Sequence, residues 1–191
     1  MKFGTFYPFV LALLPIPALA HTDVNAAYDL YTGFVHPLLG LDHLAAIMAV
    51  GVWAGLIGGR AVWAWPSAFV GVMTLGAMMA VHGASVAGAE ISIALSVMLL
   101  GLAVALRAPL PITLGALACG LFALFHGHAH GAELPVGAGV GSYIAGFVGA
   151  TALLHALGVN LGIGLSRLEG PWLPRLIGSA VVLTGLVFLV N

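Results

Sequence analysis

Apolar stretches separated by glycine, proline or charged residues make up most of the chain. A helix that crosses a bilayer needs about 20 consecutive, mainly apolar residues. Stretches near this length lie at residues 34–57, 62–86, 90–106, 111–131, 137–160 and 173–190. The pattern predicts six transmembrane helices and therefore an all-α integral membrane protein.

The first twenty residues have the pattern of a cleavable signal peptide. Lys2 supplies a positive charge, residues 6–14 are apolar, and Ala18 and Ala20 form a small-x-small cleavage site. An uncleaved first transmembrane helix is the alternative, but the apolar run is shorter than a span requires. We therefore predict a signal peptide at 1–20, a periplasmic N-terminal segment at 21–33 and a six-helix transmembrane domain at 34–191.

The arginines indicate how these helices are oriented. Arg60, Arg107, Arg167 and Arg175 all fall in connections that lie on one side of a six-helix arrangement. The arginine-rich side is cytoplasmic by the positive-inside rule. We therefore predict a multi-pass protein of the bacterial cytoplasmic membrane with both termini outside, the C-terminus at Asn191.

Composition agrees with a membrane protein and excludes several other classes. The chain is 62% hydrophobic and 6% charged, with a mean hydropathy of +1.16, whereas soluble domains carry roughly 25% charged residues. A net charge of −1 gives no indication of nucleic acid binding. The single Cys119 excludes an intrachain disulfide and a cysteine-rich metal site. Lipid is therefore a predicted partner, and close helix packing is predicted where glycines recur at four-residue spacing, at 51/55, 127/131 and 158/162.

Two short polar motifs interrupt the apolar stretches, at residues 36–43 (HPLLGLDH) and 126–133 (HGHAHGAE). Ionisable side chains are expensive in hydrocarbon and are functional candidates by default. Imidazoles and carboxylates without thiolates suit borderline divalent metals such as nickel, cobalt and zinc. The candidate metal ligands are His36, Asp42, His43, His126, His128, His130 and Glu133.

Depth and helical spacing predict that the two motifs meet. The first predicted helix runs inward and the fourth runs outward, so both motifs lie in the outer half of the membrane. His36 and His43 share a face but stand two turns apart, too far to hold one ion on a straight helix. Pro37 and Gly40 predict a broken or re-entrant start to the first helix, because both disfavour regular helix there. In the second motif 126, 130 and 133 share a face, and His128 points elsewhere.

Each candidate also has a purely structural explanation. A hydrogen bond that fixes one helix against another is the alternative for the clustered residues. It is the preferred explanation for two isolated histidines, His82 and His155, which we keep only as secondary metal candidates. His21, the N-terminal residue after cleavage, is a third secondary candidate.

The two motifs resemble those of the HupE/UreJ family of nickel permeases. The resemblance rests on His-Pro-x-x-Gly-x-Asp-His at 36–43 and on Phe-His-Gly-His-Ala-His-Gly followed by Glu133, and it extends over the whole mature chain. It implies a secondary transporter that takes up Ni²⁺ or Co²⁺ for hydrogenase or urease maturation, with the metal as substrate and with no permanently bound cofactor. A related nickel/cobalt transporter family has four residues between the first histidine and the aspartate. Here five residues separate them, which favours HupE/UreJ.

Two other classes use similar residues. A redox protein would ligate haem with paired histidines on facing helices, and a membrane metallohydrolase would keep an open water position beside His126, His130 and Glu133. The sequence has no His-Glu-x-x-His motif, no serine nucleophile elbow and no ATP-binding loop. These absences favour a permease rather than an enzyme, driven by a gradient or a partner, and leave the oligomeric state open.

Overall fold

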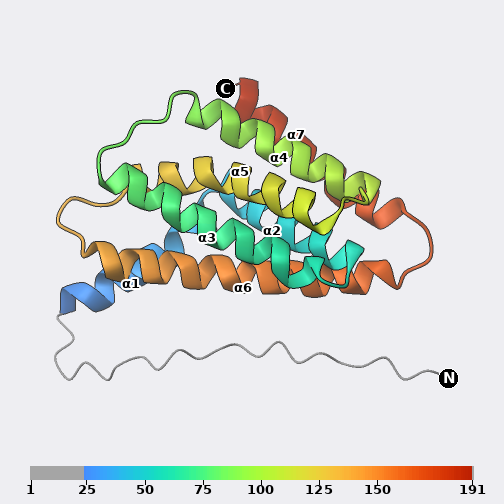
Figure 1. The fold of residues 1–191 in the computed structure, drawn as a ribbon, viewed down its shortest axis with the longest axis horizontal. Helices are drawn as coiled ribbons and strands as arrows, with labels where there is room; N and C mark the ends of the chain where they lie inside the picture. The colour runs from blue at the N-terminus through green and yellow to red at the C-terminus, as the bar shows by residue number, and fades with distance from the viewer. Residues whose placement is uncertain (1–23, 191) are drawn as a thin grey trace.

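The computed structural model describes residues 24–190, which form seven helices and no strand. In chain order these are α1 (Val24–Leu39), α2 (Leu41–Ile57), α3 (Ala61–Val81), α4 (Ala89–Leu106), α5 (Ile112–Ala132), α6 (Val140–Ser166) and α7 (Trp172–Val190). They lie side by side in an elongated bundle (Figure 1). The predicted signal peptide and His21 lie outside the described residues.

Five helices, α3 to α7, are long and apolar enough to cross a membrane. The first two helices, α1 and α2, pass the same test only as a pair, bent by 82° at Gly40, so the number of spans is five or six. Large apolar side chains such as Leu75, Leu117 and Leu176 are exposed on the outside of the bundle, where lipid would cover them. The chain is therefore a multi-pass membrane protein, and the six predicted spans match the higher number.

Two helices extend beyond the stretches expected from hydropathy, and α3 ends at Val81, five residues before the end of the stretch at 62–86. The first helix begins at Val24, ten residues before the apolar stretch, and α6 continues to Ser166 rather than ending near residue 160. Hydropathy detects the part of a helix suited to lipid, not the whole helix. The polar start of α1 is held by Asp29, whose Oδ2 accepts the backbone N–H of Gly139 at 2.7 Å.

Glycines bring the helix backbones together, as their spacing predicts. A Cβ on Gly127 or Gly131 of α5 would run into the backbone of α3 at Met73 or Ala77. Gly51 and Gly55 of α2 lie in the same way against α6, facing the glycines at 158 and 162. Accordingly α3 packs mainly on α5, and α2 packs mainly on α6.

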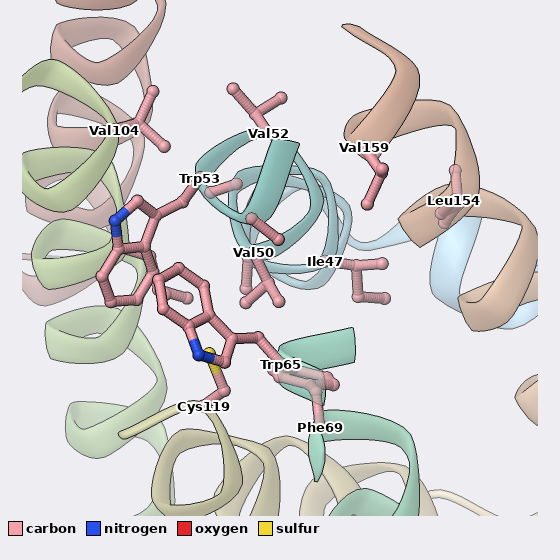
Figure 2. Close-up of a cluster of buried hydrophobic side chains, with 14 of the residues drawn as sticks. Ile47, Val50, Val52, Trp53, Trp65, Phe69, Val104, Cys119, Leu154 and Val159 are labelled. Atoms are coloured by element: carbon pink, nitrogen blue, oxygen red, sulfur yellow. The ribbon is translucent and has the colours of Figure 1, made fainter. Parts of the chain in front are cut away.

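A hydrophobic cluster fills the interior of the bundle. Figure 2 shows Trp53 of α2 and Trp65 of α3 as neighbours, with Phe69 also in the cluster. The ring centroids of the two tryptophans are 4.3 Å apart. Trp53 donates its indole N–H to the carbonyl of Ala108, and Trp65 donates to that of Ile112, both at 2.9 Å. The two tryptophans therefore lie beside the α4–α5 connection, on the side predicted to be cytoplasmic.

Candidate metal site

The break at Gly40 gives the first polar motif its shape. Gly40 has an extended backbone, with φ −87° and ψ 113°, between the end of α1 and the start of α2. A Cβ at this position would lie 3.1 Å from Asp42 Oδ1 and 3.3 Å from His43 Nδ1. Gly40 therefore leaves room for the Asp42–His43 pair. The helix break was predicted, although α1 remains helical through His36 and Pro37 and ends only at Leu39.

Four imidazoles from the two motifs lie in contact. The ring centroid of His130 on α5 is 4.7 Å from that of His36 on α1 and 4.0 Å from that of His43 on α2. His43 is also 4.8 Å from His126, one turn before His130 on α5. The bend thus lets residues 36 and 43 contact the same histidine, which a straight helix would prevent.

The four rings run from the surface of the protein into its interior. The side chain of His36 is 30% exposed and that of its neighbour Glu133 is 59% exposed. His130 and His43 are buried, and His126 is 1% exposed. The cluster is therefore open at the end of the bundle that carries the α5–α6 connection and closed at its inner end.

Each carboxylate of the motifs pairs with one histidine. Asp42 Oδ1 lies 2.8 Å from His43 Nδ1 and also accepts the backbone N–H of His43 at 2.8 Å. An ionised carboxylate only accepts hydrogen bonds, so His43 carries its proton on Nδ1 and presents a lone pair at Nε2. Carboxylates placed behind histidines in this way orient metal ligands and raise their basicity. Glu133 Oε2 is 3.0 Å from His36 Nε2, at the exposed end.

Ser96 of α4 fixes the orientation of His126. The Ser96 hydroxyl donates its only proton to the carbonyl of Ile93 at 2.7 Å. Its oxygen, 2.8 Å from His126 Nε2, therefore accepts a hydrogen bond from the ring. His126 is then protonated on Nε2 and holds a lone pair on Nδ1.

Four other ring nitrogens of the cluster are buried and have no hydrogen-bond partner among the described residues. They are Nε2 of His43, Nδ1 of His126 and both nitrogens of His130. Buried polar atoms in folded proteins are almost always satisfied, and exceptions call for an explanation such as a bound ion or water. The donor atoms of His36, His130 and Glu133 already lie within 4.8 Å of one another. Donors around one ion, each about 2.1 Å from it, are roughly 3–4 Å apart. Small rotations of these three side chains would therefore bring their donor atoms to metal-binding separations.

The remaining predicted site residues lie apart from the four rings. His128 points away, as expected from its spacing, and its Nε2 lies 2.8 Å from the Ala84 carbonyl in the α3–α4 connection. His82 is exposed at the C-terminal end of α3. His155 is buried on α6 and lies 5.2 Å from the Phe69 ring. Cys119 belongs to the hydrophobic cluster (Figure 2).

Sequence reasoning missed the residues that surround the cluster, and two of these residues carry hydroxyl groups. One is Ser96, fully buried behind His126. The other is Tyr143 of α6, whose ring is 5.9 Å from that of His36 and whose hydroxyl is buried without a partner among the described residues. A hydroxyl inside an apolar stretch was the available signal for Ser96, but nothing in the sequence pairs it with a residue 30 positions away.

The fold and this cluster define a polytopic α-helical membrane protein with a histidine and carboxylate site that extends from its surface into the bundle. A model of the HupE / UreJ protein family matches residues 9–188. Protein HupE of Rhizobium leguminosarum bv. viciae is 44% identical over 182 residues, which are 95% of this chain and 95% of that protein. No solved structure matches the chain. The chain belongs to the HupE/UreJ family.

Proposed function

We propose that this protein is a secondary transporter of the bacterial cytoplasmic membrane that takes up Ni²⁺, with Co²⁺ as the alternative cargo, for hydrogenase or urease maturation. Membership of the HupE/UreJ family supports this class of cargo. In this proposal the metal is a passing substrate, and the protein catalyses no reaction.

The observation that carries the proposal is the contact of four imidazoles at the helix break. His36, His43 and His130 come from three helices, and the buried rings keep nitrogens that have no hydrogen-bond partner in residues 24–190. Neutral imidazole with carboxylate is a donor set that suits Ni²⁺ and Co²⁺. Asp42 and Glu133 add the negative charge that offsets transfer of a dication out of water.

The side chains of the cluster become progressively less exposed from the surface toward the interior, which supports transport rather than storage. Glu133 and His36 lie at the surface, where they would receive a hydrated ion, and His126 lies at the buried end. Neighbouring rings 4.0–4.8 Å apart allow an ion to exchange one imidazole for the next without losing all its ligands at once. These short separations leave no slot for a porphyrin between His130 and either His36 or His43, which argues against the haem alternative.

Uptake of radiolabelled Ni²⁺ and Co²⁺ in a bacterial strain that lacks its own transporters for these metals tests the proposal. Cells that make the protein should accumulate one or both metals above cells with empty vector. His130→Ala should remove this uptake, whereas His82→Ala, which changes an exposed histidine outside the cluster, should retain it. Vector-level accumulation with the wild-type protein present in the membrane would rule out the proposed function.

A further inference from the structure

Tyr143 is a buried tyrosine at the exposed end of the candidate metal site. It lies in the first turn of α6 and is 2% exposed. Its hydroxyl oxygen is buried and has no hydrogen-bond partner among the described residues. A hydroxyl buried without a partner is costly, so this atom calls for an explanation.

The face of α6 that carries Tyr143 covers two histidines of the site. The ring centroid of Tyr143 is 5.9 Å from that of His36. One turn further along α6, the ring centroid of Phe147 is 4.3 Å from that of His130. Phe147 shows that a ring without a polar atom packs against a histidine here. Packing alone therefore does not require the hydroxyl of Tyr143.

Close contact between α1 and α6 holds Tyr143 in place. A Cβ on Gly33 of α1 would run into the backbone of Tyr143, and a Cβ on Gly146 of α6 would run into the backbone of Leu30. The backbone N–H of Tyr143 also donates to the carbonyl of Gly139 at 3.0 Å. The helix backbones therefore set the position of the ring, and a hydrogen bond of the hydroxyl is not needed for this.

Glu133 is the group that metal binding would leave without its hydrogen-bond donor. His36 Nε2 lies 3.0 Å from Glu133 Oε2 and donates its proton to this carboxylate. A cation bound between these two groups replaces that proton, because a metal-binding imidazole nitrogen must present a lone pair. The carboxylate then lacks a donor. Glu133 lies near enough for its charge to act on the Tyr143 hydroxyl.

We propose that Tyr143 is a positioning residue for the transported cation, whose hydroxyl donates a hydrogen bond to the Glu133 carboxylate when that carboxylate turns from His36 to the metal. The proposal rests on the proposed function. The unpartnered hydroxyl and the carboxylate that has lost its donor then satisfy each other, so this hydrogen bond forms only in the loaded site and favours it. Carboxylates that bind metals are commonly hydrogen-bonded in this way.

Tyr143→Phe removes the hydroxyl and keeps the ring. The purified variant should bind Ni²⁺ about tenfold more weakly than the wild-type protein in equilibrium dialysis. Its thermal stability without metal should be unchanged or higher, because the hydroxyl has no partner to lose there. Tyr31→Phe is the matched control, because the side chain of Tyr31 is 62% exposed on α1. Wild-type affinity in Tyr143→Phe, or a loss of stability without metal, would overturn the proposal.

A double-mutant cycle with Glu133 gives a readout that packing alone would not change. Glu133→Ala removes the proposed acceptor and leaves Asp42 and the four histidines of the cluster to bind Ni²⁺. In this background Tyr143→Phe should cause no further loss of affinity, because the hydroxyl has no carboxylate to contact. The same fold-loss in both backgrounds would show that the hydroxyl acts on something other than Glu133, and the proposal would be wrong.

The two proposals fail in different ways. If the purified wild-type protein binds no Ni²⁺ and cells that make it accumulate neither metal, the transport function is wrong. If the wild-type protein binds and takes up Ni²⁺ and Tyr143→Phe behaves as Tyr31→Phe does, transport stands and only the role of Tyr143 is wrong.

Discussion

Ser96→Ala removes the only hydrogen-bond partner that the structure gives to the ring of His126. In the wild-type protein the Ser96 oxygen, 2.8 Å from Nε2, fixes the tautomer that leaves the lone pair on Nδ1. Alanine is smaller and cannot accept, so Nε2 loses its partner and neither ring nitrogen of this residue, which is 1% exposed, has a hydrogen-bond partner among the described residues. The ring is then free to place its proton on either nitrogen or to turn away from His43.

The size of the effect follows from the role of such partners. Loss of a group that orients a metal-binding histidine typically lowers metal affinity 10–100-fold, which is about 1.4–2.7 kcal/mol. A buried hydrogen-bonding group left unsatisfied costs about 1–3 kcal/mol, a similar range. We therefore expect the apparent KM for Ni²⁺ uptake to rise 10–100-fold, with much of the maximal rate retained at saturating metal.

Initial rates of Ni²⁺ uptake over a range of metal concentrations measure this change, with the amount of protein in the membrane determined by an epitope tag. Thr74→Val is the matched control, because the Thr74 hydroxyl donates to the Val70 carbonyl of its own helix and its loss leaves the histidines unchanged. A Ser96→Ala protein with a KM within twofold of wild type would show that His126 does not need this orientation to handle metal.

Four further results are expected. Asp42→Asn should reduce uptake more than tenfold with normal membrane insertion, because the amide keeps an acceptor for His43 but loses the negative charge; unchanged uptake at low micromolar metal would contradict this. Gly127→Val should greatly lower the amount of folded protein in detergent, because its side chain would run into the α3 backbone, and a normal yield would contradict the described packing. Reporter fusions after Arg107 should report cytoplasm and fusions after Glu133 and Asn191 should report periplasm, so a cytoplasmic C-terminus would mean that the number of spans is odd. Uptake into proteoliposomes with equal pH on both sides should fall between about pH 7 and 5.5, because protons compete with the metal for the lone pairs of imidazole ligands; a flat rate would argue against histidine ligands.

The sequence was most informative where a local rule was strong. Hydropathy located the long helices, glycine spacing located the close backbone contacts, and Gly40 indicated the break that brings His36 and His43 to one neighbour. These features depend on residues a few positions apart or on the cost of polar groups in lipid. Helical spacing also separated His128 from the cluster correctly.

Features that depend on packing between distant segments were not predictable from one sequence. Ser96 meets His126 only because α4 lies beside α5, and the Phe69 ring lies between two histidines only because α3 contacts both α5 and α6. The polar start of α1 was missed for a similar reason, since its Asp29 bond is to the backbone of Gly139. Neither local propensity nor hydropathy contains information about such pairs.

The glycine contact between α2 and α6 has a mechanical consequence. Gly51 and Gly55 face their counterparts on α6, so at these positions one backbone lies directly against the other. Where backbones meet in this way, shear displaces fewer side chains than it does between helices whose ridges and grooves interdigitate throughout. Since α2 carries His43 and α6 carries His155, a small axial slip would shift these two histidines relative to each other, and bulky residues at the contact would lock the bundle in one state.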